Sequence, residues 1–359
     1  MSEKIEEIRK KIDSIDDAIV RLLEERASLS LEIGMQKHEE DAAIEDPGRE
    51  ASILERLKGM VIPPLTYQMV EDLYRLIFSI SRSLQSKKRI AYLGPEGSYS
   101  HQAAYKTFRF DSILIPKPSI DSVINEVISG RVDLGIVPVE NSTEGMINQT
   151  LDLMASSRLY VYREIMLPIV HHLLSKVDLS SITHLFSHPQ AIAQCRDWIN
   201  SNLPKAKVVE MASTSEAAMA AARHASGAAI ASEYSAELYG LNILASKIND
   251  NPDNITRFWV ISRHMAKTKG KAKTSIILTL ENVPGALYRA IGTFARQEIN
   301  LTKIESRPSK KNPWEYLFFI DIEGNLDEDD NVRMAMEDVK ACTKDIKILG
   351  SYPEGGMLT

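Results

Sequence analysis

An apolar residue recurs every three or four positions through the first part of the chain, and this feature constrains the fold most. The positions that share the spacing are Ile5, Ile8, Ile12, Ile15, Ile19, Leu22, Leu29 and Ile33. Such a spacing places all of these side chains on one face of an α-helix. It predicts one long amphipathic helix whose apolar face must pack against other helices.

Two shorter helices are predicted to follow within residues 1–86. Asp46-Pro47-Gly48 breaks the first pattern, a short helix then runs to Lys58, and Pro63-Pro64 interrupts the chain again. The third helix carries apolar residues up to Leu84. An all-helical segment of this size holds only a small core by itself, which favours exchange of helices with a second copy of the chain.

The composition argues against several classes of protein. A chain of 359 residues is long enough for two or three domains. Its net charge of −6 disfavours general nucleic-acid binding, and no apolar run is long enough to cross a membrane. The two cysteines, Cys195 and Cys342, have neither disulfide nor metal-ligand spacing, and no metal or organic cofactor is implied. With an N-terminus that has no apolar signal core, these features predict a cytoplasmic protein.

Two basic linkers divide the rest of the chain into two further segments. The first precedes residues 89–264, where short β-rich runs alternate with helical ones; this is typical of an α/β domain with ligand sites at the carboxyl ends of its strands. The second linker, Lys267–Lys273, precedes residues 273–353, whose pattern is βαββαβ. The expected fold class is multi-domain: an all-α domain, an α/β domain and a ferredoxin-like α+β domain.

Polar side chains on the predicted buried faces of the helical segment suggest an anion site. Arg26 occupies the apolar stripe between Leu22 and Leu29, and Lys37 lies about 20° from it around the same helix. These cations either extend to solvent or to an acidic partner, or they form a pocket for a dianion, because a guanidinium binds a carboxylate through two hydrogen bonds. Further candidates lie on the second and third helices: Asp46, Arg49, Glu50, Ser81 and Gln85.

Arg9 precedes Arg26 by 17 residues and lies about 100° from it around the helix, so one straight helix cannot bring both to one pocket. Positions 5–85, with Arg9 and the polar residues named above, resemble the all-helical class of chorismate mutases. The resemblance implies an intertwined dimer in which Arg9 reaches the other subunit's pocket. Arg9 and Arg26 would then bind the carboxylates of chorismate, Lys37 and Gln85 its ether oxygen, and Asp46 and Glu50 its ring hydroxyl, with Ser81 supporting a carboxylate.

Polar motifs adjoin predicted strands within residues 89–264. A glycine loop at 94–100 lacks both nucleotide-binding fingerprints. Asn141-Ser142-Thr143 follows a buried strand, and these residue types are expected to cap a helix or to bind an anion at its N-terminus. Ser187-His188 precedes a helix that carries Gln194, and Thr256-Arg257-Phe258 opens another strand.

Together these motifs resemble prephenate dehydratase, which implies two α/β lobes hinged like a periplasmic binding protein. Carried over, Thr256 is the main catalytic hydroxyl, with Arg257 and Phe258 shaping the site. The other residues implied to line the cleft are Asn141, Ser142, Thr143, Ser187, Gln194 and Thr214. The reaction needs a proton donor at the departing hydroxyl. A threonine is a very weak acid, so His188 stays an alternative donor, although we expect Thr256 to polarise the leaving oxygen directly.

Two motifs stand out in the last segment, Pro284-Gly285-Ala286-Leu287 and Glu305-Ser306-Arg307-Pro308. Within a βαββαβ pattern they resemble the ACT regulatory domain of phenylalanine-sensitive dehydratases. The resemblance implies an amino-acid site between two paired domains. The small Gly285 and Ala286 leave space for an aromatic ring, and backbone N–H groups at a helix start suit its carboxylate. Phenylalanine is therefore the expected effector, acting as an inhibitor through a population shift.

The expected protein is a homodimeric or higher-order enzyme of phenylalanine biosynthesis that converts chorismate through prephenate to phenylpyruvate. One alternative is an amino-acid-responsive binding protein without catalysis, which leaves the helical cations unexplained. Another is a dehydratase whose helical segment serves only for dimerisation. A fusion with prephenate dehydrogenase would need a nucleotide-binding glycine fingerprint, which the sequence lacks.

Overall fold

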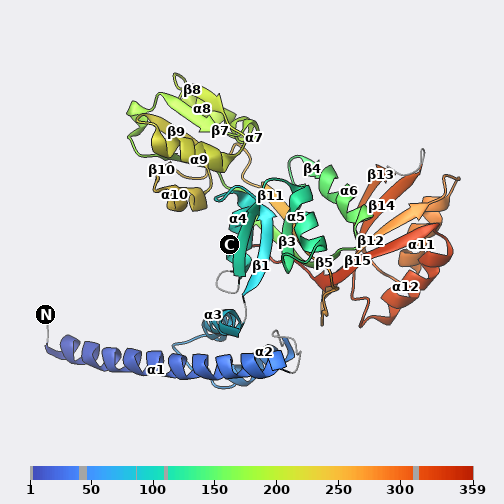
Figure 1. Ribbon diagram of the computed structural model, residues 1–359, viewed down its shortest axis with the longest axis horizontal. Helices are drawn as coiled ribbons and strands as arrows, with labels where there is room; N and C mark the ends of the chain where they lie inside the picture. The colour runs from blue at the N-terminus through green and yellow to red at the C-terminus, as the bar shows by residue number, and fades with distance from the viewer. Residues whose placement is uncertain (1–2, 40–46, 86, 109–111, 310–314, 359) are drawn as a thin grey trace. The chain divides into compact units, whose positions relative to one another are not determined.

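The computed structural model describes residues 3–39, 47–85, 87–108, 112–309 and 315–358. The chain forms two compact units. One comprises Met1–Lys88 with Thr107–Ile113, and the other comprises Arg89–Lys106 with Leu114–Thr359. Figure 1 shows the helices and strands of each unit. Within the described residues, no helix is long and apolar enough to span a membrane.

The N-terminal part of the first unit, up to Gln85, is all-helical, as predicted, with α1 (Glu3–Glu39), α2 (Pro47–Lys58) and α3 (Tyr67–Gln85). Both α1 and α2 pack against α3. The α1–α3 contact is close at Gly34, because a Cβ there would lie 2.8 Å from Gln85 Cγ. A larger side chain at Gly34 would push the two helices apart.

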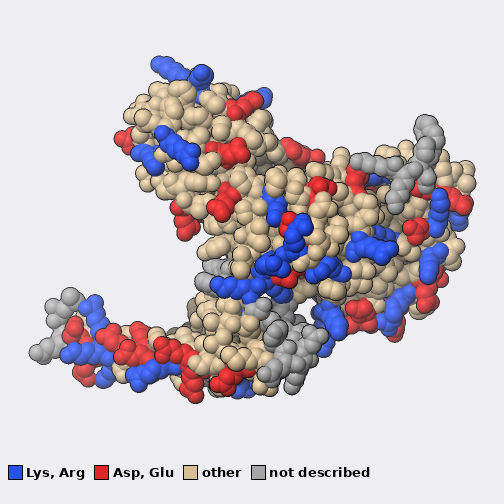
Figure 2. All heavy atoms as spheres, in the orientation of Figure 1, with Lys and Arg blue, Asp and Glu red and all other residues tan. Residues whose placement is uncertain are grey.

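Most of the apolar stripe of α1 is uncovered in the single chain. Half or more of the surface of Ile8, Ile15 and Leu22 is exposed, and α3 covers only the C-terminal part of α1 around Ser30 and Gly34. Acidic and basic side chains alternate along the visible face of the same helix (Figure 2). An exposed apolar face of this length is typical of a helix that packs against another chain.

The second unit begins with a mixed sheet in the order β2-β1-β3-β11-β5, with the short β4 on β3. Its strands are β1 (Lys88–Leu93), β2 (Ser112–Lys117), β3 (Leu134–Asn141), β4 (Gly145–Met146), β5 (Tyr160–Pro168) and β11 (Ile255–Ser262). Its helices are α4 (Tyr99–Phe108), α5 (Ile120–Ile128) and α6 (Asn148–Ser156). Strand β11 pairs with β3 and β5 and is almost entirely buried, as a continuous apolar run predicts.

A second lobe carries its own sheet in the order β10-β6-β9-β7-β8. Its strands are β6 (His172–Ser175), β7 (His184–Ser187), β8 (Lys207–Glu210), β9 (Gly227–Ala231) and β10 (Asn242–Ala245). Its helices are α7 (Pro189–Gln194), α8 (Arg196–Asn202), α9 (Thr214–Arg223), α10 (Glu233–Tyr239) and the 3-10 turn η2 (Leu179–Ser181). Residues 169–171 and 246–254 connect the lobes, and the Asn249 side chain bonds to His171 N and Ile169 O at 2.7 and 3.0 Å. The two-lobed arrangement is therefore confirmed.

The last segment adopts the predicted βαββαβ order: β12 (Ala272–Leu280), α11 (Ala286–Arg296), β13 (Leu301–Pro308), β14 (Tyr316–Glu323), α12 (Asp330–Ala341) and β15 (Asp345–Pro353). Its sheet order is β13-β14-β12-β15. The helices cover one face of the sheet. The other face shares a core with the first lobe, because Ile277, Phe319 and Tyr352 join the apolar cluster that contains Trp259. The α/β and α+β segments therefore belong to one compact unit.

Candidate active sites

In the helical unit, Arg26 is directed toward α3. Its Nη1 donates to Ser81 Oγ, and its guanidinium lies 5.8 Å from the centre of the Phe78 ring. Ser81 is buried and donates its own proton to Ile77 O. Two of the sequence-predicted residues thus meet where α1 and α3 are in contact.

Gln85 lies at the same contact, beside Gly34. Its Oε1 atom is buried without a hydrogen-bond partner among the described residues. Lys37 is half-buried one turn after Gly34. A buried amide oxygen without a partner is costly, so this end of the contact is suited to a ligand with hydrogen-bond donors or to a bridging water.

The remaining predicted residues of this unit are distributed differently. Glu50 pairs with Arg82 of α3, whereas Arg49 is exposed on α2. Asp46 lies outside the described residues. Arg9 is near Glu6, with 3.9 Å between Nη1 and Oε2, and it is more than half exposed. Along α1 it stands about 25 Å from Arg26, so one protomer does not bring these two arginines together.

In the second unit, Thr256 lies in a cluster of polar side chains where β3 and β11 pair. Its Oγ1 accepts a hydrogen bond from Asn141 Nδ2 at 2.9 Å. The same Nδ2 donates to Asn254 Oδ1 at 2.8 Å. All three residues are buried, with at most 8% of their surface exposed. Thr256 and Asn141 are direct partners in the β-ladder, which explains why residues so far apart in sequence meet.

The Asn141-Ser142-Thr143 segment does not cap a helix, contrary to the prediction from its residue types. Asn141 ends β3, a turn follows, and β4 returns on β3, so helix α6 begins only at Asn148. The turn explains the polar run: Asn141 Oδ1 accepts from the backbone N–H groups of Thr143 and Glu144 at 3.0 and 3.3 Å. Ser142 Oγ accepts from Ile255 N, which fastens the turn to the start of β11.

The predicted residues of the second lobe occupy separate positions. Gln194 joins the Thr256 cluster, because its Oε1 accepts from Asn254 Nδ2 at 3.0 Å. Ser187 is fully buried and donates to Ile230 O. His188 caps α7, with Nδ1 accepting from Gln190 N at 3.3 Å. Thr214 is half-buried at the first position of α9.

Sequence reasoning missed two residues of this region, His171 and Tyr99. His171 Nε2 lies 2.9 Å from Gln194 Oε1, and its Nδ1 lies 2.9 Å from Tyr99 Oη. Burial lowers the pKa of His171 to about 4, although the hydrogen bond to Gln194 opposes the shift. The described residues contain no group of three His, Cys, Asp or Glu that could hold a metal.

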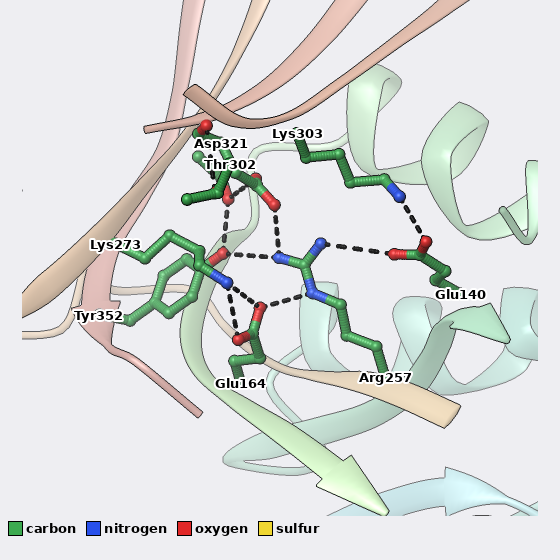
Figure 3. A network of polar contacts seen from close by, with 9 residues as sticks. Glu140, Glu164, Arg257, Lys273, Thr302, Lys303, Asp321 and Tyr352 are labelled. Atoms are coloured by element: carbon green, nitrogen blue, oxygen red, sulfur yellow. Dashed lines mark hydrogen bonds and ion pairs between the residues drawn. The ribbon is translucent and has the colours of Figure 1, made fainter. Parts of the chain in front are cut away.

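Arg257 points away from Thr256, toward the C-terminal segment. Neighbouring residues of a strand face opposite sides of a sheet, so Arg257 turns its guanidinium to Glu164 and Asp321 (Figure 3). The Nε–Oε2 and Nη2–Oδ2 distances are 2.5 and 2.7 Å. Burial by itself would lower the pKa of Arg257, but Asp321, Tyr352 and Glu164 raise it above its usual value. Phe258, the third residue of the motif, is buried.

The predicted effector residues lie at two places in the C-terminal segment. Gly285 precedes α11 with a φ of 79°, a conformation that favours glycine, and Ala286 is buried while Leu287 is half-buried. Glu305, Ser306, Arg307 and Pro308 form the end of β13, an edge strand. The Arg307 side chain contacts Asn148 and Asp152 of α6, so it ties β13 to the first lobe.

The chain thus has the parts of a multi-domain enzyme. They are a helical unit that carries cations, a two-lobed α/β domain and a βαββαβ domain attached to it. Three family models match it in that order: chorismate mutase type II over residues 8–86, prephenate dehydratase over 90–266 and the ACT domain over 274–340. The chain is 43% identical to the bifunctional chorismate mutase/prephenate dehydratase of Aquifex aeolicus and 33% identical to that of Escherichia coli K12. The first match covers 98% of this chain and 98% of the Aquifex aeolicus chain. The second covers 96% of this chain and 95% of the Escherichia coli chain.

The chain therefore belongs to the bifunctional chorismate mutase/prephenate dehydratase family, and it carries both activities. Among solved structures it is similar to the prephenate dehydratase of Arthrobacter aurescens in complex with L-Phe. That match has a TM-score of 0.68 and 34% sequence identity, and it covers 76% of this chain and 93% of the other.

Proposed function

We propose that Thr256 is the hydrogen-bond donor that polarises the departing ring hydroxyl of prephenate. In this reaction the bond to the ring carboxylate breaks and its electron pair moves into the ring. The ring C–O bond then breaks, and the hydroxide takes up one proton and leaves as water. The active site must therefore supply a donor at the leaving oxygen.

The direction of the Asn141–Thr256 hydrogen bond carries this proposal. Asn141 Nδ2 can only donate, so Thr256 Oγ1 accepts and its own proton is available to a different acceptor. A hydroxyl that accepts one hydrogen bond becomes a better donor of the next. His188 is the alternative donor, since its Nδ1 is an acceptor at the α7 cap and Nε2 would carry the proton.

The test compares Thr256→Val with Thr256→Ser in the full chain. The valine variant keeps the shape and loses the donor, so dehydratase kcat should fall by about 10²–10³, whereas the serine variant should keep most of it. Urea unfolding followed by tryptophan fluorescence is the control for folding, because the tryptophans of the chain lie in the second unit. If Thr256→Val retains turnover while His188→Asn abolishes it, the donor is His188 and this proposal is wrong.

For the mutase, we infer that Arg26 and Arg9 bind the two carboxylates of chorismate, while Lys37 and Gln85 stabilise the ether oxygen. Glu50 and Asp46 would hold the ring hydroxyl, Ser81 would orient Arg26, and Arg49 would lie at the pocket's edge. The rearrangement needs no covalent catalyst. It needs an orienting pocket and a donor at the breaking ether bond. Support comes from the Arg26–Ser81 hydrogen bond and from the place of Gln85 beside Gly34 at the same helix contact, where its Nε2 can donate to the ether oxygen.

This mutase site requires a second copy of the chain. The exposed apolar stripe of α1 is suited to an intertwined homodimer, and Arg9 would then complete the partner's pocket. Mixing tests this, because Arg9→Ala and Lys37→Ala should each lose mutase activity alone. After unfolding and refolding together, about a quarter of wild-type activity should return, since half of the dimers are mixed and each has one intact site. No recovery in verified mixed dimers would contradict the shared site.

We also propose that phenylalanine is the effector and that the enzyme works in the cytoplasm. Phenylalanine binding is supported by the L-Phe complex of the similar Arthrobacter aurescens dehydratase. Gly285 and Ala286 leave room for the ring at the start of α11, and Glu305 and Ser306 would complete the site across a pair of domains. A reducing cytoplasm is compatible with two cysteines that form no disulfide.

A further inference from the structure

A line of hydrogen bonds runs from Thr256 across the connection between the lobes to Tyr99. Asn141 Nδ2 bonds to both Thr256 and Asn254. Asn254 Nδ2 donates to Gln194 Oε1 at 3.0 Å, and Gln194 Oε1 lies 2.9 Å from His171 Nε2. The line ends at Tyr99, whose Oη is 2.9 Å from His171 Nδ1 and 2.8 Å from Val170 O.

The direction of this line is set at its first member. Two backbone N–H groups, those of Thr143 and Glu144, donate to Asn141 Oδ1. A backbone N–H can never accept, so the Asn141 amide has only one satisfactory orientation, with Nδ2 facing Thr256 and Asn254. Asn254 must then present Oδ1 to Asn141, and this turns its Nδ2 toward Gln194.

The same reasoning fixes the proton on His171. Gln194 Oε1 is an acceptor that already receives Asn254 Nδ2, so a bond to His171 requires a proton on Nε2. A neutral ring with its proton on Nε2 has an acceptor at Nδ1, which faces the Tyr99 hydroxyl; the single proton of that hydroxyl is shared between Nδ1 and Val170 O. Nearly complete burial of His171 favours the neutral form.

We propose that Asn254, His171 and Tyr99 are positioning residues of the dehydratase. They form a one-way hydrogen-bond relay that fixes the Asn254 side chain against Asn141, whose amide orientation is set by the Thr143 and Glu144 N–H groups. The relay thus keeps Asn141 Nδ2 in place on Thr256 Oγ1, and the Thr256 proton is presented to the departing hydroxyl. The inference rests on the proposed role of Thr256. None of the three residues has to touch the substrate, since they act through Asn141 and Gln194.

The relay also joins the two lobes. Asn254 and His171 lie in the two segments that connect them, and Ile169 N donates to Asn254 O at 2.7 Å. Gln194 belongs to the second lobe, whereas Thr256 and Asn141 belong to the first. The Asn254–Gln194 bond therefore joins the second lobe to the segment that leads into β11 and Thr256.

A matched pair of substitutions at His171 tests the relay. The amide nitrogen of glutamine can reach the place of Nε2, whereas that of asparagine reaches only the place of Nδ1. His171→Gln should keep dehydratase kcat within about threefold of wild type, because it still donates to Gln194. His171→Asn should lower kcat by about tenfold or more with KM changed by less than about threefold, as for a displaced catalytic group.

Equal losses of kcat in the two variants, or no loss in either, would overturn the relay. Asn254→Asp gives a second test, because a carboxylate cannot donate to Gln194; its kcat should fall by about tenfold, and wild-type turnover would overturn the proposal. Urea unfolding followed by tryptophan fluorescence reports the folding of the second unit in each variant. If Thr256→Val loses activity while the His171 pair behaves alike, the relay fails and the role of Thr256 stands. If Thr256→Val keeps activity, both fail.

Discussion

Replacing Arg257 by methionine should lower the free energy of unfolding of the second unit by about 3–5 kcal/mol, the usual cost of removing one partner from a buried ion pair. Glu164 and Asp321 are 2% and 7% exposed as side chains, so neither can recover its hydration when the guanidinium is lost. Glu164 keeps Lys273 at 3.0 Å, whereas Asp321 keeps only the neutral donor Ser275 among the polar contacts described here. Most of the cost therefore comes from Asp321.

Urea unfolding followed by tryptophan fluorescence measures this loss, because Trp259 lies 5.6 Å from the Arg257 guanidinium. Arg131→Met is the matched control. Arg131 also forms an ion pair, with Glu126, but its side chain is 63% exposed, so the change should stay within about 1 kcal/mol. If Arg257→Met unfolds at the wild-type urea concentration yet loses dehydratase turnover, Arg257 acts on the substrate and not on the domain contact.

Three further outcomes are expected. Gly34→Ala should lower mutase kcat by about tenfold or more and leave the dehydratase unchanged, because its Cβ would lie 3.2 Å from the Gln85 backbone; unchanged chorismate turnover would contradict this. Asp321→Asn should raise the phenylalanine concentration for half-inhibition by about tenfold, because Asp321 on β14 of the βαββαβ segment pairs with Arg257 on β11. The same change at the exposed Asp330 should leave this concentration unchanged. Burial lowers the pKa of His171 to about 4, so the neutral ring contributes fully to the free energy of unfolding above pH about 6.5. This contribution, about 3 kcal/mol in all, is lost as the pH falls from there through 4. Urea unfolding at pH 7 and 4.5 should show a smaller loss for His171→Gln than for wild type.

The order of the domains could be predicted from the sequence because each has its own periodicity. The three-four spacing of α1 and the βαββαβ alternation depend on local rules, and both were confirmed. Arg26 and Ser81 were predictable for the same reason: each is a polar residue at an apolar position of its helix. The likeness to the family supplied the roles that spacing alone left open.

The polar contacts of the second unit depend on strand pairing, which one sequence does not specify. The Asn141 segment was misassigned to a helix cap, because the same residue types also stabilise a turn between strands. The opposite orientation of Arg257 had a usable signal, since it alternates with Thr256 along one strand. Its carboxylate partners, Glu164 and Asp321, are distant in sequence, so no local pattern could have identified them.

The most direct test of the account is to incubate the purified chain with chorismate, without nicotinamide or metal, and to identify the product. Phenylpyruvate is the expected product, with prephenate as the transient species, and added phenylalanine should inhibit its formation. Prephenate alone would contradict the dehydratase site around Thr256. No conversion of chorismate, together with no conversion of added prephenate, would contradict both sites.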